Sequence, residues 1–133
     1  MKKTFVFCAL ALAGLLVAPV APALAKKAPP VASLDTDNDG TVDVNEANKS
    51  AEALFTKLDK DNDGTLEPKE LQGRLSKKEF KAADPDNDGT LSKDEYLAVV
   101  GKLFKEADGD NEGTLDDKEF ASKQGKALLR VVR

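Results

Sequence analysis

The twelve residues Asp35–Glu46, DTDNDGTVDVNE, decide how this chain folds, because the chain repeats them three more times. The later copies are DKDNDGTLEPKE from Asp59, DPDNDGTLSKDE from Asp84 and DGDNEGTLDDKE from Asp108. Every copy has acidic residues at positions 1, 3 and 5, glycine at 6, threonine at 7, an aliphatic residue at 8 and glutamate at 12. Consecutive copies begin 24 or 25 residues apart. A repeat of this kind predicts one structural unit that is used four times.

Each copy has the chemistry of a site for a hard cation, and it resembles the loop of the EF-hand family. Such an ion takes six to eight oxygens, which alternate side chains, a backbone carbonyl at position 7 and both oxygens of the last glutamate can supply. Glycine at position 6 permits the sharp turn. The predicted ligands are Asp35, Asp37, Asp39, Thr41, Asp43 and Glu46 in loop one; Asp59, Asp61, Asp63, Thr65, Glu67 and Glu70 in loop two; Asp84, Asp86, Asp88, Thr90, Ser92 and Glu95 in loop three; and Asp108, Asp110, Glu112, Thr114, Asp116 and Glu119 in loop four.

The N-terminal segment has the features of a secretory signal peptide. Lys2 and Lys3 precede an apolar stretch that ends in Ala23-Leu24-Ala25, which predicts cleavage after residue 25 and a periplasmic location. The alternative is an uncleaved membrane anchor. Residues 26–33 are expected to be a flexible leader and residues 34–133 the metal-binding domain. After cleavage we expect no membrane association.

Charge in the predicted mature chain is concentrated in the four loops. Without the signal peptide, 18 basic residues face 24 acidic ones, a net charge of −6, and 19 of those acids occupy the ligand positions. The rest of the chain is therefore mildly basic, and the acidity indicates binding of cations.

Composition argues against an enzyme. The chain has no His, and its single Cys, Cys8, lies in the predicted signal peptide, which excludes imidazole ligands, disulfides and thiolate sites from the mature protein. No motif indicates nucleic-acid binding, and we expect a monomer whose partners are metal ions.

The short spacing of the loops predicts a compact, all-α helical bundle. A helical period favours one continuous helix over residues 44–58, which would hold loops one and two apart, and a similar helix between loops three and four. Gly73 and the capping-box sequence Ser76-Lys77-Lys78-Glu79 indicate a break between loops two and three. The chain can fold back there, which predicts pairing of loop two with three and one with four. Pairing of one with two and three with four is the alternative.

The predicted core is small. The aliphatic residues at position 8 are expected to pair between neighbouring loops, and the apolar residues after Gly125 to form a short helix that closes the core or, alternatively, a strip that binds a partner. Because the loops carry four or five carboxylates each, which repel one another without an ion, we expect folding to be coupled to metal binding.

The chain as a whole resembles the lanmodulin family, small periplasmic lanthanide-binding proteins associated with methylotrophic bacteria. The resemblance rests on the signal peptide, the loop spacing, ELQGRLSKKEF at 70–80, DPDNDGTLSKDEYLAVV at 84–100 and the ending ASKQGKALLRVVR. It implies a compact three-helix arrangement that binds lanthanide(III) ions such as La, Ce and Nd in preference to Ca2+. It also implies a link to uptake or trafficking of these ions and to a periplasmic dehydrogenase or metal-uptake protein.

Two alternatives remain beside a lanthanide carrier, buffer or switch: a calcium buffer or sensor, and a module that binds a partner protein when loaded with metal. Two positions depart from the expected pattern. Family members often have proline at position 2, where only Pro85 does so here, and Glu112 replaces the usual aspartate at position 5. The longer Glu112 side chain predicts that loop four is the weakest or most altered site, while Ser92 leaves loop three with the fewest charges.

Overall fold

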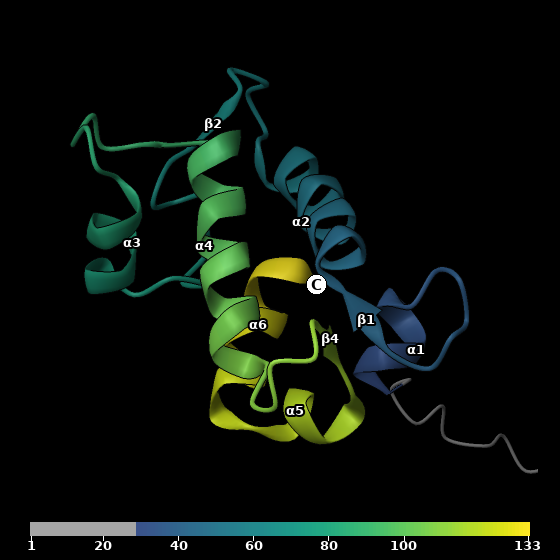
Figure 1. Ribbon diagram of the computed structural model, residues 1–133. Coiled ribbons are helices and arrows are strands. Elements are labelled where there is room, and N and C mark those ends of the chain that lie inside the picture. The colour runs from purple at the N-terminus through teal and green to yellow at the C-terminus, as the bar shows by residue number, and fades with distance from the viewer. Residues whose placement is uncertain (1–28) are drawn as a thin grey trace, which may run out of the picture.

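A computed structural model describes residues 29–133, and the predicted signal peptide lies outside the described residues. Six helices and four two-residue strands make up this part of the chain (Figure 1). None of these helices combines the length and apolar character that a membrane crossing needs. The prediction of an all-α bundle with four closely spaced loops is confirmed.

Two long helices form the centre of the fold. Helix α2 spans Val44–Leu58 and helix α4 spans Lys93–Ala107, and the two pack against each other. Each has 15 residues, so each separates the loops at its two ends by roughly 22 Å. The predicted continuous helix between loops one and two is confirmed with the same bounds.

The four loops pair as the spacing predicts. Strand β1 (Val42–Asp43) pairs antiparallel with β4 (Thr114–Leu115), and β2 (Thr65–Leu66) pairs with β3 (Leu91–Ser92). The position-8 residues oppose one another in both pairs, and all four are fully buried: Val42 with Leu115, and Leu66 with Leu91. Loops one and four therefore lie at one end of the molecule and loops two and three at the other (Figure 1).

The connection between loops two and three contains no long helix. Gln72 and Gly73 both have positive φ, 50° and 77°, and end a series of turns that follows loop two. Helix α3 (Lys77–Ala83) then starts at the predicted capping box, in which the Ser76 hydroxyl accepts from the Glu79 amide. Because turns replace a second helix here, Glu70 lies in a turn and does not open a helix as the glutamates of the other loops do.

The C-terminal segment folds as two short helices. Helix α5 (Asp117–Ala121) follows loop four, and α6 (Lys123–Val132) starts directly after it at the N-cap Ser122. Gly125 lies inside α6 and not before it. Glycine is required at this position, because a side chain there would collide with the backbone of α5. Helix α6 packs on both α2 and α4, which confirms that its apolar face belongs to the core.

The expected boundary of the leader is wrong in part. Residues Pro30–Leu34 form helix α1, which contacts α5 and α2, and its Val31 and Leu34 side chains are buried. A proline at the first helical position favours this start, since its missing amide would have no partner there. Residues 30–33, which we assigned to the leader, thus belong to the folded domain.

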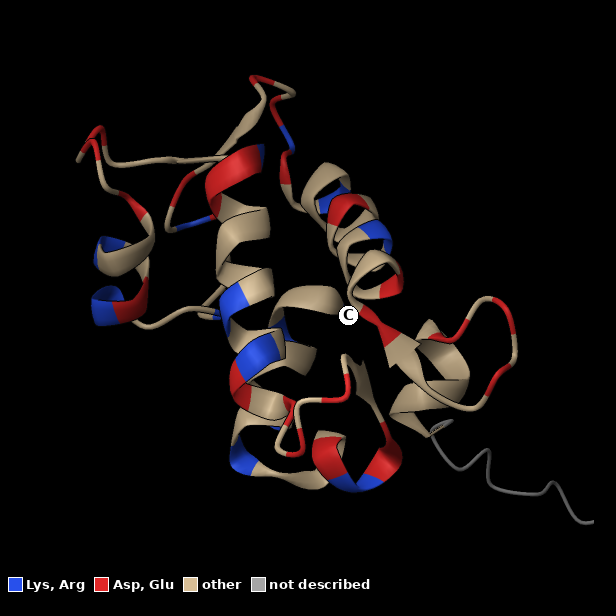
Figure 2. Ribbon diagram, viewed as in Figure 1, with Lys and Arg blue, Asp and Glu red and all other residues tan. Residues whose placement is uncertain are grey.

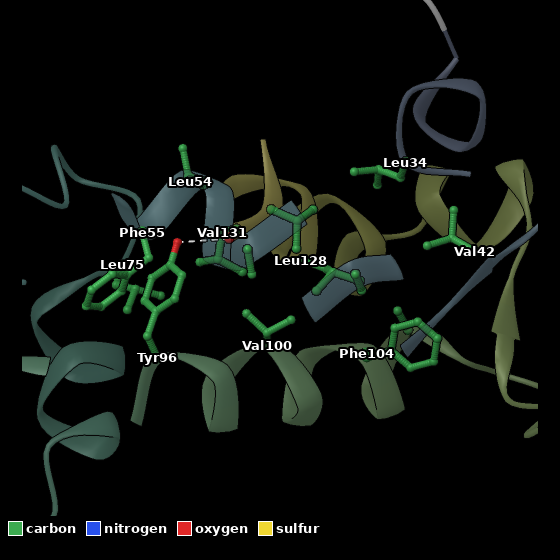
Figure 3. Close-up of a cluster of buried hydrophobic side chains, with 14 of the residues drawn as sticks. Leu34, Val42, Leu54, Phe55, Leu75, Tyr96, Val100, Phe104, Leu128 and Val131 are labelled. Atoms are coloured by element: carbon green, nitrogen blue, oxygen red, sulfur yellow. Dashed lines mark hydrogen bonds between the residues drawn. The ribbon is translucent and has the colours of Figure 1, made fainter. Parts of the chain in front are cut away.

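The core lies between α2, α4 and α6 (Figure 3). Phe55 and Tyr96 meet edge to face with ring centroids 5.6 Å apart. The Tyr96 hydroxyl donates to the Val131 carbonyl at 2.8 Å, and burial raises the pKa of Tyr96 to about 12. Side chains from two other segments also reach the last turn of α6: Ser50 donates to Val132, and Arg74 donates to the carbonyls of Arg130 and Arg133.

Candidate metal-binding loops

Each loop is shaped by the same hydrogen bonds within it. In all four, the amide of the position-6 glycine donates to Oδ2 of the position-1 aspartate, at 3.0 or 3.1 Å. The amide of position 5 donates to the position-3 aspartate, at 3.2–3.4 Å. These bonds hold one carboxylate oxygen of each of the first two acids against the loop backbone and leave the other oxygen for a ligand.

Two residues in each loop have the left-handed backbone that such a tight turn requires. The position-6 glycines have φ between 86° and 91°, as expected. The position-4 residue, which the sequence analysis passed over, also has positive φ, between 57° and 63°. It is asparagine in every copy, the side chain that tolerates this conformation best after glycine, and its fourfold recurrence was the available signal: Asn38, Asn62, Asn87 and Asn111.

Acidic side chains converge in all four loops. In loops two, three and four, the acids of positions 1, 3 and 12 bring one oxygen each to within 4.8 Å of the others; in loop one the acids of positions 1, 3 and 5 do so. That limit is about twice a calcium–oxygen bond of roughly 2.4 Å, so each group can share one ion. Figure 2 shows these acidic residues at the two ends of the molecule, where the paired loops lie.

The inner oxygen of the position-1 aspartate supports a bound cation in three of the loops. Oδ1 of Asp59, Asp84 and Asp108 is buried and accepts no hydrogen bond within the described part of the chain. A buried carboxylate oxygen without a donor is costly, and a cation at the centre of the loop would remove that cost. The donor set, composed of oxygens alone, suits a hard cation.

Desolvation and the repulsion between neighbouring carboxylates raise the pKa of the position-3 acids in three of the loops. The pKa of Asp61 is raised by desolvation and by the charges of Asp63 and Glu70. The amide of Asp39 lowers the pKa of Asp37, but desolvation and the neighbouring carboxylates outweigh it, so the net shift is upward. The position-3 acid of loop three, Asp86, behaves in the same way. These groups favour a neutralising partner, which a cation supplies.

The position-9 residues have a second role. The side chains of Asp43, Ser92 and Asp116 cap the helices that follow loops one, three and four, each accepting from the amide of the position-12 glutamate. Asp43 and Asp116 do not belong to the converging groups of acids. The structure thus brings together most closely the predicted ligands at positions 1, 3 and 12 in loops two, three and four, and those at positions 1, 3 and 5 in loop one. The position-9 side chain serves as a helix cap in loops one, three and four.

Loop four departs from the others at the predicted residue. In loops one to three, the position-5 aspartate accepts from both the amide and the hydroxyl of the following threonine, at 2.8 or 2.9 Å. Glu112 keeps only a 3.2 Å bond from the Thr114 hydroxyl. The longer side chain has altered this part of the loop, and the low affinity expected for loop four stays a prediction.

Comparison with protein families agrees with the geometry. A family model described as EF hand matches residues 51–76 and 77–100, which include loops two and three. The middle of the chain thus consists of EF-hand units. The acidic loops of this protein bind metal ions, and loops one and four, outside the matched stretches, share with loops two and three the bond from the position-6 glycine amide to the position-1 aspartate. No curated protein matches the chain significantly.

Proposed function

We propose that this EF-hand protein is a periplasmic carrier, buffer or switch that binds lanthanide(III) ions in preference to calcium and folds on binding them. The observation that carries the proposal is the set of inner aspartate oxygens, buried without a donor among converging carboxylates in loops two to four. The resemblance to the lanmodulin family over the whole predicted mature chain supports the same conclusion.

Charge supports a trivalent ion. At equal distance, a site with five carboxylates attracts a trivalent ion about 1.5 times as strongly as a divalent one. Loops one, two and four present five carboxylates each and loop three presents four. The trivalent ion also loses more hydration, so selectivity requires that the excess attraction exceed this cost.

Coupled folding is supported by how much of the structure depends on the loops. Both strand pairs lie within loops, and three helices start at a capping position inside one. Without an ion, mutual repulsion of the carboxylates opposes closing the loops, and the small core has to overcome it alone.

Calcium is the second candidate, because EF-hand loops typically bind Ca2+ and the matched family model covers loops two and three. Competitive titration of the mature protein with lanthanum and calcium, followed by circular dichroism, separates the two. We expect lanthanum to complete the gain in helix at stoichiometric amounts and calcium only in large excess. Folding by calcium at comparable concentrations would establish the calcium alternative, and no response to either ion would refute metal-coupled folding.

A matched control uses the four position-12 glutamates. Their replacement by glutamine keeps the size of the side chains and removes one charge from each loop. This variant is expected to need far more lanthanum for the same change in helix content. The residues replaced are Glu46, Glu70, Glu95 and Glu119.

The periplasmic location follows from the predicted signal peptide. If cleavage occurs after Ala25, mass spectrometry of the exported protein will find Lys26 at its amino terminus; a retained apolar segment would indicate the membrane anchor. A metal-dependent partner such as a dehydrogenase or uptake protein is a further alternative role, which pull-down with and without lanthanum tests.

A further inference from the structure

Loop one differs from the other loops in the position of its last glutamate. In loops two, three and four, the position-12 glutamate belongs to the converging group of ligand oxygens. In loop one the group consists of the acids at positions 1, 3 and 5, and Glu46 is not part of it. The glutamate that should close the shell around an ion is therefore directed elsewhere.

Thr36 is the residue that holds Glu46. Its backbone amide and its hydroxyl both donate to Oε1 of Glu46, the hydroxyl at 2.9 Å, while the amide of Asp43 donates to Oε2 at 3.1 Å. Glu46 is only 9% exposed and thus buried, whereas the position-12 glutamates of the other loops are half-buried. Both of its oxygens are thus satisfied by the loop itself.

The first ligand of loop one is satisfied in the same way. Oδ1 of Asp35 accepts from the amide of Asn38, whereas the equivalent oxygens in loops two, three and four have no donor in the described region. Loop one therefore pairs internally the two ligands that begin and end its sequence.

Loop three shows the opposite arrangement. Position 2 is Pro85, which has no amide hydrogen, and Glu95 accepts only at Oε2, from the amide and hydroxyl of Ser92. Lys60 and Gly109 in loops two and four donate a backbone amide to the last glutamate but no hydroxyl. The loops thus differ in how many hydrogen bonds position 2 donates to the last glutamate: Thr36 donates most and Pro85 donates none.

We propose that Thr36 latches Glu46 inside loop one, so that loop one takes up its ion after loops two and three. The latch must open before Glu46 can turn both oxygens to the ion, and this lowers the affinity of loop one. Counting carboxylates predicts the reverse for loops one and three, since loop one has five and loop three has four. The inference rests on the proposed function, because it concerns the filling order of the same metal sites.

The four position-6 glycines allow each loop to be followed separately. Each donates its amide to the first aspartate of its own loop, so its nuclear magnetic resonance signal reports on the ion in that loop. Lanthanum, which is diamagnetic, is added in steps to the mature protein. We expect the Gly64 and Gly89 signals to reach their bound positions before that of Gly40.

Substitution of Thr36 tests the cause. Thr36→Val removes the hydroxyl and keeps the shape of the side chain, and it is expected to raise the affinity of loop one about tenfold, the effect of one hydrogen bond to a charged group. Thr36→Ser keeps the hydroxyl and is expected to behave as the parent. The matched control is Thr56→Val, which removes an exposed hydroxyl bonded to the Glu52 carbonyl in the last turn of α2, at the end of that helix opposite loop one.

The outcomes separate this inference from the proposed function. If no glycine signal responds to lanthanum, the proposed function fails. If all respond but Gly40 moves before or together with Gly64 and Gly89, the latch is refuted while metal binding stands. The latch is equally refuted if Thr36→Val leaves the order unchanged, or if Thr36→Ser and Thr36→Val act alike.

Discussion

At the scale of single residues, the same capping pair of side chains occurs both inside and outside the metal loops. The position-9 residues of three loops cap the following helix, and the position-12 glutamate of the same loop completes each capping box. Ser76 and Glu79 form the same reciprocal capping hydrogen bonds at the start of helix α3, where there is no metal loop. Capping and metal binding are therefore coupled in the loops and separate at α3.

The Glu79 carboxylate gives a pH-dependent prediction. Hydrogen bonds from Ser76, aided by the Arg130 guanidinium, hold the pKa of Glu79 below its ordinary value of 4.5. A carboxylate with a lowered folded-state pKa adds stability above pH 4.5 and loses it as the pH falls through the folded-state value. We expect Glu79→Gln to cost about 0.5 kcal/mol at pH 7, since the group is well exposed.

Chemical denaturation of both proteins with saturating lanthanum between pH 3 and pH 7 measures this difference. The gap between parent and variant should close as the pH drops below 4.5. A gap of constant size over this range would show that the Glu79 charge is not involved.

At the scale of elements, helices α4 and α6 each contain one glycine, for different reasons. A Cβ at Gly101 in α4 would meet nothing within 4 Å, whereas a Cβ at Gly125 in α6 would lie 2.1 Å from the Glu119 carbonyl oxygen in α5. Gly101 is thus only a weak point in its helix, while Gly125 allows α6 to pack directly on α5.

The two glycines make a matched pair for mutation. Gly101→Ala is expected to stabilise the loaded protein by about 0.5–1 kcal/mol, because alanine loses less backbone entropy in a helix. Gly125→Ala is expected to destabilise it by at least about 2 kcal/mol, since the added methyl forces α5 and α6 apart. Thermal denaturation with saturating lanthanum measures both. Equal effects of the same sign would contradict the contact between α5 and α6.

At the scale of the whole molecule, the last turn of α6 joins segments that are distant in sequence. Its carbonyl groups have no partners within the helix, and Ser50, Arg74 and Tyr96 supply donors from α2, the turn after loop two and α4. The C-terminus is therefore held by segments that each follow a different metal loop.

Arg74 makes more of these hydrogen bonds than Ser50 or Tyr96, because one guanidinium nitrogen donates to two carbonyls, at 2.6 and 2.7 Å. We expect Arg74→Gln to destabilise the loaded protein by about 2 kcal/mol, the usual range for lost hydrogen bonds from a charged donor. Thermal unfolding measures this loss. Lys126→Gln, an exposed change on α6 outside the metal loops, is the control and should leave the midpoint unchanged.

Local sequence determined the loops and the long helices. The loops follow from acidic residues at alternate positions and glycine at position 6, and the first long helix follows from the helical period over 44–58. These patterns act between residues that are close in sequence, so the sequence alone is enough to predict them. The pairing of the loops also followed, because 12 or 13 residues between loops leave room for one helix that keeps its two ends apart.

Tertiary structure alone decided the remaining features. Helix α1 forms because Val31 and Leu34 find a buried surface that residues far along the chain provide. The donors to the end of α6 come from three separate segments, and the hold of Thr36 on Glu46 depends on how tightly loop one closes. Such contacts depend on the distance between atoms that only the folded chain brings together, whereas ligand type and spacing are properties of the sequence itself.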